Sequence, residues 1–275
     1  MYNKKLLFSI GAFLLLIGLV AFIFYLSQKQ STDKTNPFFK PTQKQQPAQP
    51  PSRLLNLTNW KLTLPITSPD DSTKPQEILQ PELATYQIDP WFMVTPDEKG
   101  VVFRAPVNAP TTANSGYPRS ELREMTSGGK QEFFWPSSKG THTLFIEEAI
   151  TAVPKNKPDV VAGQIHGDDD DLLVIRLEGE KLFLARGSAN LATLDENYTL
   201  GKRFSIKLVA KSGEIMTYYN NSASPIHTLE KKVNQAYFKV GVYTQSNCKT
   251  EKLSSLCSAD NYGEVIIYQA KVTHE

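Results

Sequence analysis

The sequence predicts an all-β fold, an antiparallel sandwich or jelly roll formed by residues 54–275. From Trp60 onward, short runs with period-two alternation of apolar and polar residues are separated by clusters of Pro, Gly, Asn and Ser. Helices do not alternate with strands, and the one stretch with helical character, 78–86, is interrupted by Pro81. These observations favour a single all-β domain over an α/β or helical fold.

Two of the gaps between the expected strands have the composition of hairpin turns. Residues 178–180 and 211–214 each contain a glycine between strand-forming segments. Pro65 is expected to end the first strand, because proline cannot donate to a sheet ladder. The predicted strands are 60–64, 101–105, 120–125, 143–151, 160–166, 172–177, 181–185, 204–210, 215–219, 237–245 and 264–272.

The N-terminal 53 residues are expected to lie outside this domain. An uncharged apolar run begins at Leu6, and as a helix it would span about 30 Å, enough to cross a bilayer. Residues 6–27 are therefore predicted to be a hydrophobic helix that anchors the chain in the membrane, or else a signal peptide. Lys4 and Lys5 predict that residues 1–5 lie in the cytoplasm and that the rest of the chain is exported. The exported part is expected to be membrane-anchored if the hydrophobic segment is retained, or secreted if it is cleaved. Residues 28–53 are rich in Gln and Pro, which predicts a disordered linker.

The composition limits the partners and cofactors to consider. A net charge of +2 gives no reason to expect a nucleic-acid partner, so selectivity for a charged ligand must come from a local cluster. Cys248 and Cys257 are predicted to form a disulfide in an exported chain, with two free thiols or part of a metal site as alternatives. The acidic run 168–171 lacks the ligand spacing of a calcium loop and is expected to be a solvated turn. We therefore expect no metal and no cofactor.

Three of the predicted strands each place polar side chains on one face. In 237–245, alternation separates apolar Phe238, Val240 and Val242 from a polar face, on which Gly241 leaves a gap that we expect a ligand to occupy. Taken singly, each strand could be an ordinary surface strand, and the alternating charges of the second could be a surface ladder. The polar faces consist of Lys239, Tyr243 and Gln245 in the first, Arg119, Glu121 and Arg123 in the second, and Gln164 and His166 in the third.

Together these faces suit one type of reaction, an elimination next to a carboxylate. Arg119 and Gln164 can neutralise the acid, so that the proton on the neighbouring carbon becomes removable. His166 or a deprotonated Tyr243 can act as the base, and Tyr243 can protonate the departing oxygen.

The three segments, in this order, resemble the signature strands of alginate lyases of polysaccharide lyase family 7. The similarity extends from 60–65 to the C-terminus and rests on the segments 119–123, 164–166 and 237–245. It implies a β-jelly-roll whose concave sheet binds alginate, a chain of mannuronate and guluronate. Ser120 and Thr244 depart from the Thr and Asn that are frequent in the family, which puts subsite preference in doubt but not activity.

The resemblance also implies roles for single residues. Arg119 and Gln164 would neutralise the uronate, and Tyr243 would be the acid and, for mannuronate, also the base. His166 would be the base for guluronate, and Ile165 goes with activity on guluronate-containing substrates. Four further residues would hold sugars or orient the groups that neutralise the uronate, and they are Glu121, Arg123, Lys239 and Gln245.

We therefore expect a monomeric, endo-acting alginate lyase that cleaves by β-elimination and leaves an unsaturated uronate. A non-catalytic alginate-binding module is the alternative, although it would not need both His166 and Tyr243. A retaining glycoside hydrolase would need two carboxylates about 5 to 5.5 Å apart. Glu121 has no such partner on its predicted face.

Overall fold

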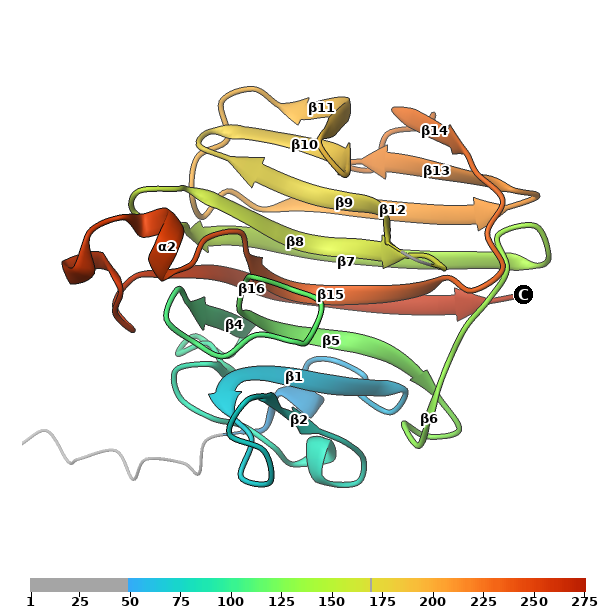
Figure 1. Cartoon of the computed structure of the whole chain (residues 1–275). Helices are drawn as coiled ribbons and strands as arrows, with labels where there is room; N and C mark the ends of the chain where they lie inside the picture. The colour runs from blue at the N-terminus through green and yellow to red at the C-terminus, as the bar shows by residue number, and fades with distance from the viewer. Residues whose placement is uncertain (1–48, 169) are drawn as a thin grey trace, which may run out of the picture. The chain divides into compact units, whose positions relative to one another are not determined.

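Two antiparallel β-sheets pack face to face in the computed structural model, which describes residues 49–168 and 170–275 (Figure 1). The predicted cytoplasmic segment, the hydrophobic segment 6–27 and most of the linker lie outside the described residues. The folded unit starts earlier than residue 54, because Pro51–Arg53 form a 3-10 turn, η1, in which Pro51 is buried. Ser52 Oγ also donates to the carbonyl of Ala84, 2.6 Å away, and so ties this turn to the domain.

The first sheet has nine strands and contains all three of the predicted polar strands. Its order is β11-β10-β9-β8-β15-β5-β1-β2, with β6 paired to β5. The strands are β1 (Trp60–Thr67), β2 (Pro75–Ile78), β5 (Arg119–Thr126), β6 (Gln131–Glu132), β8 (Asp159–His166), β9 (Asp171–Glu178), β10 (Lys181–Arg186), β11 (Ala189–Asp195) and β15 (Tyr237–Thr244).

The second sheet has seven strands in the order β14-β13-β12-β7-β16-β4-β3. They are β3 (Phe92–Val94), β4 (Val101–Pro106), β7 (Thr141–Ala152), β12 (Phe204–Lys211), β13 (Glu214–Tyr219), β14 (His227–Glu230) and β16 (Tyr262–His274). The described helical elements are short: η1, η2 (Glu82–Ala84), α2 (Cys248–Glu251) and η3 (Ser254–Leu256). The predicted all-β jelly roll is thus confirmed, and the stretch 78–86 contributes only the three-residue η2.

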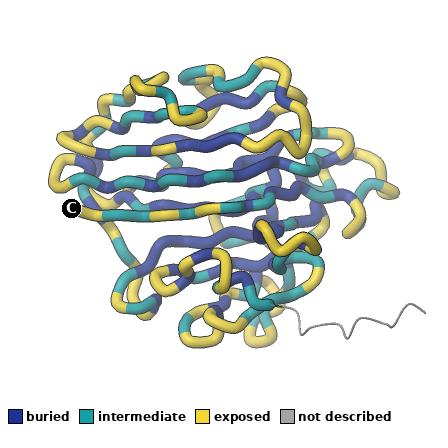
Figure 2. The backbone as a smooth tube through the Cα atoms, turned by 180° about the vertical axis from the view of Figure 1, so that it is seen from behind, coloured by how far each residue is buried: buried dark blue, intermediate teal, exposed yellow. Residues whose placement is uncertain are grey.

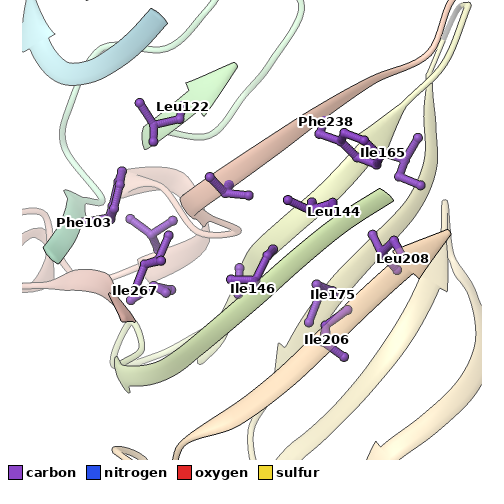
Figure 3. Close-up of a cluster of buried hydrophobic side chains, with 14 of the residues drawn as sticks. Phe103, Leu122, Leu144, Ile146, Ile165, Ile175, Ile206, Leu208, Phe238 and Ile267 are labelled. Atoms are coloured by element: carbon purple, nitrogen blue, oxygen red, sulfur yellow. The ribbon is translucent and has the colours of Figure 1, made fainter. Parts of the chain in front are cut away.

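The core lies between the sheets, as the alternation predicted. Figure 3 shows Leu122, Ile165 and Phe238 of the first sheet in one cluster with Leu144 and Leu208 of the second. All five are buried, and each such side chain contributes about 1.5–3 kcal/mol when it leaves water. Exposed residues concentrate in the loops at the strand ends (Figure 2). No helix in the described ranges is long and apolar enough to cross a membrane.

Local predictions about turns were correct in two places and wrong in one. The hairpins β9–β10 and β12–β13 form as expected, with Gly179 at φ 61° and Gly213 at φ 86° in their turns. Pro65, however, does not end β1, which continues to Thr67. The proline is tolerated because β1 pairs with β5 only from Trp60 to Thr63 and its register with β2 shifts between Thr63 and Thr67, so no regular ladder bond is needed there.

The disulfide between Cys248 and Cys257 is present, as predicted, and closes the segment that holds α2 and η3. Asn247 caps α2, since its Oδ1 accepts the backbone N–H groups of Lys249 and Thr250. The Nδ2 of Asn247 donates to the carbonyl of Gly116, 2.8 Å away. Asn247, the residue that precedes the disulfide-closed segment, therefore holds the loop 107–118, which joins β4 to β5.

Candidate active site

The register brings the three polar strands together as neighbours in the order β8, β15, β5. Lys239 lies opposite Gln164 of β8 and Arg123 of β5, and Tyr243 lies opposite Arg119. Segments more than 100 residues apart in sequence thus present one continuous polar face.

Gly241 has a different role from the predicted one. Its φ is 133°, and the register of β15 against β8 shifts between Val240 and Tyr243, so the strand carries a bulge there. A Cβ at this position would lie 2.5 Å from the carbonyl oxygen of Ser120 and 2.9 Å from the ring of Phe103. Close packing of β5 and the core therefore demands the glycine, and it does not provide space for a ligand.

A cavity of about 300 Å³, called the central cavity below, opens on this polar face. Five of the predicted site residues line it: Arg119, Arg123, His166, Lys239 and Tyr243. Its other lining residues come from strands of the same sheet and from the loops 107–118 and 167–170, and they are Lys61, Thr63, Glu77, Thr112, Asn114, Ser115, Glu132, Asp170, Asp171 and Tyr237.

Glu121 lies beneath this cavity and holds three of its side chains. Its Oε2 is 2.6 Å from Lys239 Nζ and 2.8 Å from Arg119 Nη1, and its Oε1 accepts a hydrogen bond from Gln164 Nε2 at 2.5 Å. Only 2% of Glu121 is exposed. The geometry makes Glu121 the anion that orients the other three groups.

The charges of this cluster depend on one another. Burial by itself would raise the pKa of Glu121, but Lys239 and Arg119 outweigh it and lower that pKa. Burial likewise opposes the charge of Arg119, yet the attraction of Glu121 prevails and the pKa of Arg119 is raised. For Lys239, burial dominates and lowers the pKa. The cluster keeps its carboxylate and its guanidinium charged in the interior.

Gln164 is 1% exposed and does not line the central cavity. One hydrogen of its amide is donated to Glu121, and its carbonyl oxygen is buried without a hydrogen-bond partner among the described residues. The Nε of Arg119 is also buried and unpartnered there. Both orphaned atoms lie in the same cluster, and buried polar atoms without a partner are rare enough in folded proteins to need an explanation, such as a catalytic role or a bound water or ion.

The tautomer of the His166 ring is set by a hydrogen bond to the backbone. Its Nδ1 lies 3.0 Å from the carbonyl oxygen of Gly167, so Nδ1 carries the hydrogen and Nε2 of the neutral ring keeps its lone pair. Its ring stacks on Tyr237, with centroids 5.1 Å apart and planes at 14°. The aromatic contact fixes the direction in which Nε2 points.

Tyr243 is held from several sides. The guanidinium carbon of Arg119 lies 4.0 Å from the centre of its ring, and its hydroxyl is 2.8 Å from Ser115 Oγ. Behind it, the ring packs on a small apolar cluster that includes Val161 and Phe183.

Arg123 sits at the other end of the cavity among aromatic rings. Its guanidinium carbon is 4.1 Å from the centre of the Tyr237 ring and 4.9 Å from that of Phe134. Its Nη2 lies 3.4 Å from a carboxylate oxygen of Glu132. Tyr237 was missed as a site residue, although alternation places it on the same face as Lys239.

The central cavity is more acidic than the sequence suggested. Glu77 and Glu132 reach it from β2 and β6 and both pair with Lys61, at 3.0 and 3.4 Å. The predicted solvated turn contributes Asp171, whose Oδ1 is 3.9 Å from His166 Nε2. Burial is the main cause that raises the pKa of Asp171. No periodic signal marked these residues, because β2 and β6 are very short and Asp171 follows a loop.

Gln245 does not line the central cavity. It is 8% exposed, its backbone carbonyl accepts a hydrogen bond from Lys157 Nζ at 2.7 Å, and its Nε2 is buried without a partner among the described residues. Ser120 and Thr244, the two departures from the family pattern, are buried and bond to the carbonyls of Trp91 and Ala105. None of the three touches the cavity.

The described residues contain no group of three or more His, Cys, Asp or Glu side chains that could hold a metal ion. A second cavity, of about 260 Å³, is lined by Glu124 and His274 among others and contains none of the predicted site residues.

A jelly roll with this arrangement, buried cations around one carboxylate next to a tyrosine and a histidine, has the groups that can bind an acidic ligand and exchange protons with it. Residues 55–274 match the family model described as alginate lyase, and the chain belongs to that family, polysaccharide lyase family 7. It is accordingly a polysaccharide lyase.

Individual relatives agree with this assignment. The alginate lyase of Klebsiella pneumoniae is 27% identical, and the alignment covers 82% of this chain and 91% of the relative. Among solved structures, the alginate lyase from Corynebacterium sp. is 44% identical with a TM-score of 0.78, covering 84% of this chain and all of the other. The alginate lyase AlgAT5 is 47% identical with a TM-score of 0.75, covering 82% and 98%.

Proposed function

We propose that this protein cleaves the 1,4-glycosidic bonds of alginate by β-elimination. The observation that carries the proposal is that Arg119, His166 and Tyr243, predicted from three separate strands, line one cavity. The products would be oligosaccharides with an unsaturated 4-deoxy uronate at the new non-reducing end.

The first requirement of the reaction is a neutralised carboxylate. Arg119 and Lys239 line the cavity as cations held by one buried carboxylate, so they are rigid and partly desolvated before a substrate arrives. Such preorganised charge stabilises the anionic intermediate without reorganisation at the moment of reaction. Gln164 is proposed to assist through the amide hydrogen that Glu121 does not use.

The second requirement is a base and an acid. For guluronate, His166 Nε2 takes the proton from C5, the electron pair forms the C4–C5 double bond, and the bond from C4 to the glycosidic oxygen breaks. Tyr243 gives its proton to that oxygen. For mannuronate, the C5 proton lies on the side of the leaving oxygen, so Tyr243 as a phenolate takes it and passes it on.

The finer specificity that we propose is endo action with a preference for guluronate-containing blocks. Ile165 motivates this preference, but its side chain is fully buried in the core. Any influence of Ile165 on block preference is therefore indirect, through the position of its neighbours Gln164 and His166.

We also propose that the lyase domain is exported and tethered by the hydrophobic segment 6–27, with secretion as the outcome if that segment is cut. Fractionation of cells that express the full chain, followed by mass determination of its N-terminus, tests this. Recovery of the intact chain in the cytoplasmic fraction would contradict it.

The test of the activity is product formation by the full chain on polymannuronate and polyguluronate, followed by the ultraviolet absorbance of the unsaturated uronate. Tyr243→Phe keeps the ring, its contact with Arg119 and the fold, but it removes the proton donor. We expect at least about a 100-fold loss in kcat for this variant, with alginate binding retained. Near wild-type product formation by Tyr243→Phe would refute the mechanism.

A further inference from the structure

Ser115, in the loop 107–118, touches the one hydroxyl on which the proposed chemistry depends. Its Oγ is 2.8 Å from the hydroxyl oxygen of Tyr243, and within the described ranges it is the hydrogen-bond partner of that hydroxyl. The same Oγ lies 3.1 Å from the backbone nitrogen of Tyr117 and 3.1 Å from its carbonyl oxygen.

The Ser115 hydroxyl can bond all three neighbours while Tyr243 is a neutral phenol, but not when Tyr243 is a phenolate. A serine hydroxyl has one hydrogen and two lone pairs, and the N–H of Tyr117 occupies one lone pair. When the Ser115 hydrogen points to the carbonyl of Tyr117, the second lone pair accepts the hydrogen of the Tyr243 hydroxyl. When the hydrogen points to Tyr243, Ser115 becomes a donor to a phenolate oxygen. A rotation about the Cβ–Oγ bond exchanges the two states.

We propose that Ser115 is a positioning residue that accepts a hydrogen bond from Tyr243 as an acid and donates one to Tyr243 as a phenolate. The inference rests on the proposed function, because it assigns a partner to its acid and base. The proton of the reaction passes between C5, Tyr243 and the glycosidic oxygen, while Ser115 keeps its own hydrogen throughout and changes only its direction.

The surroundings of Ser115 hold it in place for this task. The backbone N–H of Ser115 donates to the carbonyl of Thr112 at 2.9 Å, and the next residue, Gly116, accepts a hydrogen bond from Asn247. Tyr117 packs edge-on against Tyr243, with ring centres 6.3 Å apart. On the Tyr243 side, Arg119 fixes the ring. Both ends of the hydrogen bond are thus preorganised before a substrate binds.

The test compares Ser115→Thr with Ser115→Val, two variants of nearly equal size that differ in the hydroxyl. A hydrogen bond to a charged group is lost in Ser115→Val, so we expect kcat to fall roughly 10- to 100-fold while KM stays within about twofold. Ser115→Thr should keep kcat within about fivefold of wild type, since only a methyl group is added. Ser115→Ala is expected to follow Ser115→Val.

Ser222 offers a matched control in the turn between β13 and β14 of the other sheet, because this half-buried serine also accepts a backbone N–H at its Oγ, that of Tyr219 at 3.2 Å. Ser222→Ala should leave kcat unchanged. The inference is refuted if Ser115→Thr and Ser115→Val lose activity equally, or if the loss lies in KM alone. An inactive wild-type chain would overturn the proposed function as well, whereas an active wild type with a fully active Ser115→Val overturns only the role of Ser115.

Discussion

Replacing Glu121 by Gln removes the one carboxylate that two buried cations share. Lys239 Nζ and Arg119 Nη1 lie 2.6 and 2.8 Å from the same oxygen, and each of these residues is 9% exposed. Glu121→Gln has nearly the same shape, so the change is one of charge and not of packing. Two buried cations without a counter-ion would then face each other.

Removing one partner of a buried ion pair typically costs about 3–5 kcal/mol, because the remaining charge stays desolvated. We expect that loss in the free energy of unfolding of Glu121→Gln at neutral pH. For a domain of this length it corresponds to a fall in Tm of roughly 6–20 °C. Urea and thermal unfolding of the two proteins, side by side, measure it.

The effect must also depend on pH in a defined direction. The pKa of Glu121 is lowered in the folded state from its ordinary value of 4.5, so its stabilising contribution is present above that value. The contribution is lost as the pH falls through the folded-state pKa. The stability difference between wild type and Glu121→Gln should therefore shrink below pH 4.5.

Asp195 provides the control, since its Oδ2 is also 2.6 Å from a lysine, but that lysine, Lys202, has 51% of its side chain exposed. Exposed pairs contribute about 0–1 kcal/mol, so Asp195→Asn should change stability far less than Glu121→Gln. The reasoning predicts a large loss of stability in Glu121→Gln because its two cations are buried. Equal effects of the two substitutions, or a Glu121→Gln variant as stable as wild type at pH 7, would refute it.

Three further predictions concern other residues. His166→Ala should lower kcat on polyguluronate by about 100-fold or more and on polymannuronate by less, and equal losses in product absorbance would argue against separate bases. Glu148 is fully buried with both oxygens unpartnered among the described residues, and burial raises its pKa well above 4.5. The folded state therefore favours the protonated carboxyl, and stability falls as the pH rises from 4.5 towards that folded-state pKa. Unfolding measured across pH should show Glu148→Gln to be more stable than wild type at neutral and higher pH and to lack this decline. Gly241→Ala should destabilise by about 2–4 kcal/mol in urea unfolding, because φ 133° and the approach of Ser120 both oppose a side chain, and an unchanged midpoint would contradict this.

Alternation along the strands predicted which side chains share a face, and for β5, β8 and β15 it was correct. Phe238, Val240 and Val242 are fully buried in the core, while Lys239 and Tyr243 line the cavity. The pairing of these strands could not be obtained from one sequence, because β5 and β15 lie more than 100 residues apart and period two carries no information about neighbours. The resemblance to a known family, and not the alternation, brought them together.

The period-two alternation could not indicate how far each side chain on the polar face lies below the cavity surface. Glu121 and Gln164 point to the same side of the sheet as Arg119 and His166, yet they are 2% and 1% exposed, and Glu121 bonds to its neighbours. Arg119, Arg123, His166, Lys239 and Tyr243 line the cavity, whereas Glu121 and Gln164 on the same strands do not.

Burial below the cavity surface also gives Glu121 a different role from that of a carboxylate at the surface. A charge at the cavity surface can be screened by solvent and by the substrate, but one beneath it acts with little screening on the groups above. Glu121 can therefore fix Arg119 and Lys239 before any uronate arrives, which a surface carboxylate such as Glu132 could not do as strongly. Substitution of Glu121 should disturb every step that uses those two cations, while substitution of Glu132, with half of its side chain exposed, should affect only its neighbours Arg123 and Lys61.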